Sequence, residues 1–167
     1  MPAVRRANGS NGSSRFYKTT NWEGTTISQM NLHPCVNLSF NGQCEAAFRY
    51  YERCLHGKIT FMLTWGDSPM AKDAPPAWSG KIAHATLEIG DARIQGSDVA
   101  PGGYETPRGF AISLDPDVAE AETLFAALAE GGTVIVPFQQ TFWARAFAVV
   151  TDRFGIPWII NAGEPSA

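Results

Sequence analysis

The chain has 167 residues, with 13 Lys and Arg against 16 Asp and Glu, and 44% of its residues are hydrophobic. This content is too apolar for a disordered chain, and a net charge of −3 lacks the basic excess that is typical of a nucleic-acid-binding surface. The length is that of one domain of ordinary size.

The first 29 residues differ in charge from the rest of the chain. They hold four basic residues (Arg5, Arg6, Arg15 and Lys18) against Glu23 alone, a net +3, which leaves −6 for residues 30–167. This segment is rich in Gly, Ser, Asn and Thr and has no long apolar run, so we expect neither a secretory signal nor a membrane span in it. We expect a flexible N-terminal extension over 1–29, followed by one domain over 30–167. A transit peptide is the alternative, which Gly and Asn disfavour because they are poor helix formers.

Three cysteines, Cys35, Cys44 and Cys54, form an odd set whose spacing matches no zinc-binding template. Without a secretory signal we expect reduced thiols and a cytoplasmic protein. Cys44 and Cys54 fall on the apolar face of a predicted helix, where we expect them to be small buried side chains.

The first half of the domain predicts a strand, a helix, a strand, a Pro-rich loop and two further strands. We expect these at 35–40, 43–55, 58–65, 66–80, 82–89 and 92–96. Asn41 is the expected N-cap of the helix and Gly57 its terminator. The third element is expected to place Ile59, Phe61, Leu63 and Trp65 on one face. Gly90-Asp91 is a two-residue hairpin signal between the last two strands.

The second half repeats this order after a connector over 97–109. We expect a strand, a helix and three strands, at 110–114, 116–130, 133–138, 145–151 and 157–161. Asp115-Pro116 is expected to start the helix and Gly131-Gly132 to end it. Its buried stripe is expected to comprise Val118, Ala121, Leu124, Phe125 and Leu128. Each half is therefore a β-α-β-β-β module, at about 33–97 and 108–163, and the two modules must close on each other to bury their sheets.

Four motifs occur in order along these modules. They are Leu38-Ser-Phe-Asn-Gly-Gln-Cys-Glu-Ala-Ala-Phe-Arg-Tyr-Tyr51, Ile82-Ala-His-Ala-Thr-Leu-Glu-Ile-Gly90, Gln140-Thr-Phe-Trp143 and Thr151-Asp-Arg-Phe-Gly-Ile-Pro-Trp158. With them, residues 32–163 resemble the vicinal oxygen chelate superfamily of glyoxalases, bleomycin resistance proteins and extradiol dioxygenases. The nearest resemblance is to its PhnB-like branch, also labelled 3-demethylubiquinone methyltransferase-like. The resemblance implies an α+β fold of paired βαβββ modules, a curled mixed sheet that forms a cup, and a homodimer.

Metal-dependent members of this superfamily place ligands on the first strand, on a later strand of the first module and on the last strand. Only His84 matches such a position in this chain. The first-strand position falls near Pro34 or Cys35, with His33 offset from it, and the last falls on Ile159, which has no lone pair to donate. We therefore expect no usual divalent metal site and no other cofactor. A metal held by His84 and His33 with a carboxylate, Glu88 or Glu45, is the alternative.

Several side chains are candidates for contact with a ligand in the cup. His84 can exchange a proton near neutral pH or serve as a hydrogen-bonded cavity residue without chemistry. Gln139, Gln140 and Trp143 offer amide and aromatic groups that either hold a ligand or brace the dimer and the sheet. Trp65, with Trp78, brackets the Pro-rich loop, which is a candidate lid.

These residues leave more than one function open. The first hypothesis is a homodimeric protein that binds a small organic molecule in its cup, with neither nucleic acid nor a membrane as partner. The second is an enzyme, a glyoxalase-like lyase or isomerase or a dioxygenase, that uses His84, and the third is a structural dimer with a filled cup. A methyltransferase is not expected, because the chain lacks the glycine-rich βαβ unit that would bind S-adenosylmethionine.

Overall fold

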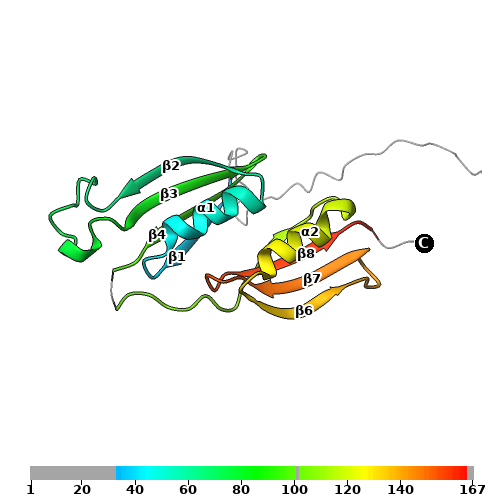
Figure 1. Cartoon of the computed structure of the whole chain (residues 1–167). Coiled ribbons are helices and arrows are strands. Elements are labelled where there is room, and N and C mark those ends of the chain that lie inside the picture. The colour runs from blue at the N-terminus through cyan, green and yellow to red at the C-terminus, as the bar shows by residue number, and fades with distance from the viewer. Residues whose placement is uncertain (1–32, 101, 165–167) are drawn as a thin grey trace, which may run out of the picture. The chain divides into compact units, whose positions relative to one another are not determined.

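The computed structural model describes residues 33–100 and 102–164, and in this part of the chain two modules of the same element order follow each other (Figure 1). The first contains β1 (Val36–Phe40), α1 (Cys44–Cys54), β2 (Lys58–Thr64), the short 3₁₀ helix η1 (Pro76–Trp78), β3 (Ile82–Ile89) and β4 (Ala92–Asp98). The second contains β5 (Ile112–Leu114), α2 (Val118–Ala129), β6 (Thr133–Gln139), β7 (Ala146–Thr151) and β8 (Pro157–Ala162). The expected α+β fold of two βαβββ modules is confirmed.

Each module forms its own four-stranded sheet, in the order β1-β4-β3-β2 (sheet 1) and β5-β8-β7-β6 (sheet 2). The first strand of each module pairs in parallel with the last, and the remaining pairs are antiparallel. By its contacts the chain divides between Pro34 and Cys35, and both modules lie in the unit that begins at Cys35. The extension expected over 1–29 lies outside the described residues.

The two helices follow the predicted apolar periodicity. In α1, the buried residues Cys44, Ala47, Phe48 and Tyr51 recur at intervals of three and four, which places them on one face against sheet 1. In α2, Ala121 and Leu128 are buried, and the other three residues of the predicted stripe are partly buried against the same core. As predicted, a glycine terminates α2, since Gly131 follows the C-cap Glu130 and adopts a φ of 71°.

The predicted helix caps were wrong in three places. The N-cap of α1 is Gln43, not Asn41. The amide of Cys44, in the first turn, instead donates a 2.9 Å hydrogen bond to Asp98 Oδ1 in β4. His56, with a φ of 50°, takes the left-handed position that was expected of Gly57. The helix α2 begins two residues later than expected, with Asp117 as its N-cap in place of Asp115-Pro116.

The prediction that residues 59, 61, 63 and 65 share one face of β2 was also wrong. Ile59 pairs with Leu87 on the core side of β3, whereas Phe61 pairs with Thr86 on the opposite side. A register shift at Thr60 separates them, and such a bulge inserts one residue and reverses the alternation of the strand. Phe61 is consequently 48% exposed.

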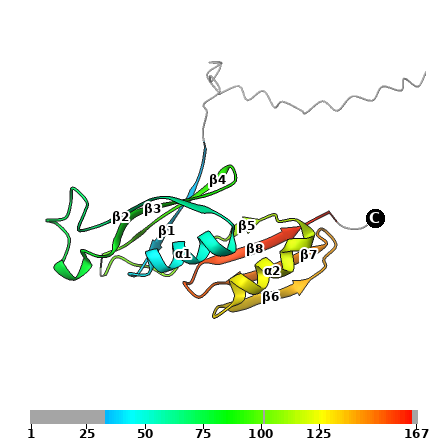
Figure 2. The ribbon, with the colours of Figure 1, turned by 45° about the horizontal axis from the view of Figure 1, so that its top comes forward.

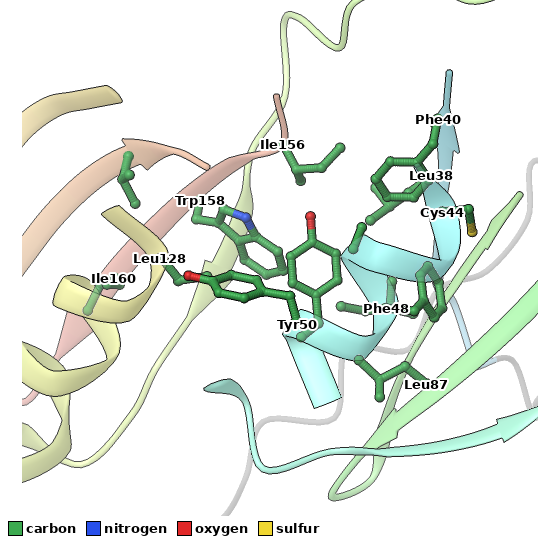
Figure 3. Close-up of a cluster of buried hydrophobic side chains, with 14 of the residues drawn as sticks. Leu38, Phe40, Cys44, Phe48, Tyr50, Leu87, Leu128, Ile156, Trp158 and Ile160 are labelled. Atoms are coloured by element: carbon green, nitrogen blue, oxygen red, sulfur yellow. The ribbon is translucent and has the colours of Figure 1, made fainter. Parts of the chain in front are cut away.

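One hydrophobic core joins the two modules (Figure 3). The ring of Tyr51, from α1, packs against Trp158 of β8 with 5.2 Å between their centroids, and Tyr50 packs against Phe154 at 5.8 Å. The Tyr50 hydroxyl donates to the carbonyl of Ala127 in α2. The helices of the two modules are therefore in direct contact, and each sheet turns one face toward this shared core.

A buried carboxylate lies at the junction of the modules. Asp152, which is 3% exposed, accepts hydrogen bonds at Oδ2 from the Tyr51 hydroxyl at 2.6 Å and from Trp158 Nε1 at 2.8 Å. Its Oδ1 accepts the amides of Phe154 and Ile156. Burial and the adjacent Asp152 carboxylate raise the pKa of Tyr51, so this phenol stays protonated and remains a donor. The sequence predicted a turn at this position, but the four hydrogen bonds that Asp152 accepts were not predicted.

Candidate functional site

The face of sheet 1 that points away from the core is polar. Leu38, Phe40, Leu87 and Ile94 are buried on the core face, and because side chains alternate along a strand, their neighbours point the other way. The strand register aligns Asn37 with Gln95, Gln95 with Thr86, and Thr86 with Phe61 across all four strands. The residues of this polar face are Asn37, Ser39, Phe61, Leu63, His84, Thr86, Gln95 and Ser97.

His84 lies on this polar face and is half-buried. Its Nε2 is 3.3 Å from the Thr86 hydroxyl, and the ring of Phe61 lies 5.8 Å away between centroids. These two neighbours orient the imidazole, which can donate or accept a hydrogen bond toward a bound molecule. The structure thus places His84 outside the hydrophobic core.

The superfamily's metal pattern does not fit the donors found here. Among the residues that the structure describes, no group of three or more His, Cys, Asp or Glu side chains is placed to hold a metal ion. Ile159 occupies the last-strand position with an aliphatic side chain, and Cys35 Sγ donates to Gln95 Oε1 at 3.4 Å. Glu88 lies opposite Lys58 and Arg93 in the register of the neighbouring strands.

Glu45, the other carboxylate weighed for a metal site, lies away from His84. Glu45 is on α1, which packs on the core face of sheet 1, and its carboxylate is 3.7 Å from Arg49. The structure therefore puts a sheet between Glu45 and His84. His33 is exposed.

The outward face of sheet 2 is apolar and aromatic. The register aligns Phe147 with Asn161 and Val149 with Ile159, all on the side opposite the buried Ala148, Val150 and Trp158. Trp143 packs against Phe147 with 5.3 Å between ring centroids, and Phe142 contacts Trp143 at 4.5 Å. The residues of this aromatic face are Gln139, Phe142, Trp143, Phe147, Val149 and Ile159.

A short turn between β6 and β7 presents the aromatic pair. The Thr141 hydroxyl accepts hydrogen bonds from the amides of Trp143 and Ala144, and the Thr141 amide donates to the Ala144 carbonyl at 3.0 Å. Phe142 is 86% exposed and Trp143 45% exposed, so the turn fixes two large apolar rings in solvent. Gln139 and Gln140, the two predicted amide contacts, are exposed beside them.

The base of the loop between β2 and β3 is held by hydrogen bonds to other residues of the first module. Trp65 Nε1 donates to the Asp98 carbonyl at 3.2 Å, and the amides of Trp65 and Gly66 donate to the carbonyls of Lys81 and Ser79. Trp65 therefore uses its polar group within the protein and anchors the base of the loop, whereas His84, Gln139 and Trp143 lie on outward faces.

A pocket that was not predicted opens between β1 and the connector of the two modules. Its volume is about 350 Å³, and its walls are Asn37, Leu38, Ser39, Glu105, Thr106, Pro107, Arg108 and Phe110. The Gly and Pro content of the connector indicated only a linker, since the sequence does not show that residues 105–110 return to β1.

Comparison with known proteins places this geometry in context. Residues 32–160 match the family model described as the glyoxalase/bleomycin resistance protein/dioxygenase superfamily. The protein YjdN of Escherichia coli K12 is 37% identical over 133 residues, which cover 74% of this chain and 90% of YjdN.

Two solved structures share the arrangement of both modules. The crystal structure of protein PA1353 from Pseudomonas aeruginosa is 44% identical, with a TM-score of 0.74, over 81% of this chain and all of PA1353. A PhnB protein from Bacillus cereus, described as a putative 3-demethylubiquinone-9 3-methyltransferase, is 18% identical with a TM-score of 0.67 over 78% of this chain and 98% of that protein. The second comparison shows a shared fold.

Proposed function

Because the chain belongs to the glyoxalase/bleomycin resistance protein/dioxygenase superfamily, we propose that it is a PhnB-like, homodimeric protein that binds a small organic molecule without the superfamily's usual divalent metal. The observation that carries this proposal is the contrast between the two outward faces. One is polar around His84 and Thr86, and the other is aromatic around Trp143 and Phe147. Polar groups that fix orientation and aromatic groups that supply contact area are the two components of small-molecule sites.

The proposed homodimer follows from the placement of these faces. Both helices share one core within the chain, so the polar face of sheet 1 and the aromatic face of sheet 2 point away from that core and do not face each other (Figures 1 and 2). A second copy can supply the missing wall to each. Its apolar contact would include Phe142 and Trp143, which are 86% and 45% exposed. Exposed apolar clusters of this kind mark interaction surfaces.

The remaining parts of the proposal concern compartment and membrane. Among residues 33–100 and 102–164, no helix is long and apolar enough to cross a membrane. Cys35, Cys44 and Cys54 are free thiols, which fits the reducing cytoplasm that we propose as the location of the protein.

Ligand binding is tested with benzamide, whose ring suits the aromatic face and whose amide suits the polar face. In amide NMR spectra of the full-length protein, benzamide should shift the signals of His84, Thr86 and Trp143. His84→Phe, which keeps an aromatic ring of similar size, should reduce these shifts, and His56→Asn on the loop after α1 should not. Shifts confined to other surfaces would refute the proposed site.

The metal-free form is tested by elemental analysis of the purified protein. We expect Mn, Fe, Co, Ni and Zn each well below one equivalent per chain. One equivalent of a divalent metal that is lost in His84→Phe but retained in His56→Asn would overturn this part of the proposal and favour a metal-dependent lyase, isomerase or dioxygenase.

A further inference from the structure

The pocket between β1 and the connector has a strand wall with unusual hydrogen-bonding capacity. Three consecutive residues, Asn37, Leu38 and Ser39, line it. Leu38 as a whole residue is 1% exposed and belongs to the core, so the polar groups of this wall are the side chains of Asn37 and Ser39. Because β1 stands at the end of the strand order of sheet 1, its outer edge has no neighbouring strand in that sheet. The Asn37 amide group and the Ser39 hydroxyl are therefore presented together at this end of the sheet.

The connector wall carries one charge of each sign. Glu105 and Arg108 both line the pocket and are exposed. In the described part of the chain, the ion pairs are Arg49–Glu45, Arg49–Glu52 and Arg153–Glu130, so Glu105 and Arg108 are paired neither with each other nor with another side chain. A ligand that carries both charges can satisfy the two groups at once, which a simple anion or cation cannot.

The remaining features set the size and apolar content of such a ligand. Phe110 lines the pocket and is 45% exposed, which is a large apolar surface to leave in water. The volume of about 350 Å³ lies near the lower limit of ligand pockets, about 300–1,000 Å³. The pocket therefore suits a small molecule with one short apolar group.

We propose that this pocket binds a free α-amino acid with an apolar side chain. Arg108 pairs with the carboxylate, Glu105 with the ammonium group, and Phe110 covers the side chain, while Asn37 and Ser39 supply neutral hydrogen bonds. This inference goes beyond the proposed function, and its pocket lies at the β1 end of the polar face, away from His84. His84 is on β3, two strands from β1, which corresponds to about 10 Å across the sheet.

The test is an NMR titration of the full-length protein with L-leucine and two analogues that each lack one charge. These are 4-methylpentanoic acid, which lacks the ammonium group, and 3-methylbutylamine, which lacks the carboxylate. Leucine should shift the amides of Asn37, Ser39, Thr106 and Arg108 in a saturable manner, and each analogue should bind at least about tenfold more weakly. Equal binding of the three molecules, or no shift at these residues with leucine, would overturn the proposal.

Variants separate the two charges. Arg108→Gln and Glu105→Gln should each weaken leucine binding by about tenfold, because a hydrogen bond to a charged group is lost. The matched controls Arg53→Gln on α1 and Glu122→Gln on α2 remove the same charges from other exposed positions and should leave leucine binding unchanged. Equal effects of the connector and control variants would show that net charge, and not the pocket, governs binding.

The outcome is distinguishable from that of the benzamide experiment. If leucine does not bind but benzamide still shifts the His84 signal, only the amino-acid pocket is refuted. Leucine binding without benzamide shifts at His84 refutes the proposed cup site and leaves the amino-acid pocket in place.

Discussion

Removal of the Tyr51 hydroxyl is expected to destabilise the junction between the modules. In Tyr51→Phe the ring remains packed against Trp158, but Asp152 Oδ2 loses a 2.6 Å hydrogen bond from a fully buried donor. A hydrogen bond to a charged group contributes about 1.5–3 kcal/mol, and because Tyr51 and Asp152 are both buried we expect a loss of about 2–3 kcal/mol. For a chain of this size that corresponds to a decrease in Tm of roughly 5–10 °C.

Urea unfolding monitored by tryptophan fluorescence measures this loss directly, since Trp158 donates to the same carboxylate. Tyr104→Phe is the matched control, because Tyr104 is only half-buried and its hydroxyl makes no hydrogen bond within the described residues. The control should change the free energy of unfolding by less than about 0.5 kcal/mol. If Tyr51→Phe is as stable as the control, the Tyr51–Asp152 hydrogen bond does not stabilise the junction between the modules.

Three further predictions address packing, pH and assembly. Gly96→Ala should cost about 1–3 kcal/mol in urea unfolding, because an added Cβ would lie 2.6 Å from a Phe48 ring carbon, whereas Gly80→Ala, with open space around it, should be neutral. Burial raises the pKa of the Cys54 thiol to about 11, so the unfolded chain loses this proton first and stability should fall as pH rises from about 9 to 11. Cys54→Ala should flatten that decline in pH-dependent unfolding, and an unchanged slope would refute the assignment. Phe142→Asp should shift a dimer toward monomer in sedimentation equilibrium, and an unaltered association constant would exclude the aromatic face from the interface.

Local patterns predicted most of the elements. The two helices and the strands of both modules lie within a few residues of their expected positions because apolar periodicity and glycine stops are properties of neighbouring residues. The hairpin at Gly90-Asp91 is likewise local, and Gly90 has a φ of 56°. The resemblance to a known family then supplied the pairing of the modules.

The helix-cap errors at His56 and Asp117 are local shifts of one or two residues, whereas the other differences involve groups that are distant in sequence. The Cys44 amide in the first turn of α1 donates to Asp98, which is 54 residues away, so the nearby Asn41 does not cap the helix. The bulge at Thr60 depends on the register with β3 and leaves no mark in the alternation of β2. Asp152 has the same sequence signature as any turn aspartate, although it receives a hydrogen bond from Tyr51, 101 residues away.

Which candidate site residues share a face could not be predicted for the same reason. His84 and Trp143 were identified by type and position, and both lie on outward faces. The contacts of Trp65 with Asp98 and the return of Glu105 and Arg108 to β1 are tertiary features that only the folded chain shows.

The Tyr51–Asp152 hydrogen bond also governs what happens when the chain is cut. It joins the first module to the second independently of the exposed connector, together with the Tyr50 contact to Ala127 and the shared core. A protease that cleaves within residues 102–109 would therefore leave two fragments that stay associated without a covalent link. The same contacts would let two separately produced halves of the chain reassemble, as the subunits of a heterodimer do.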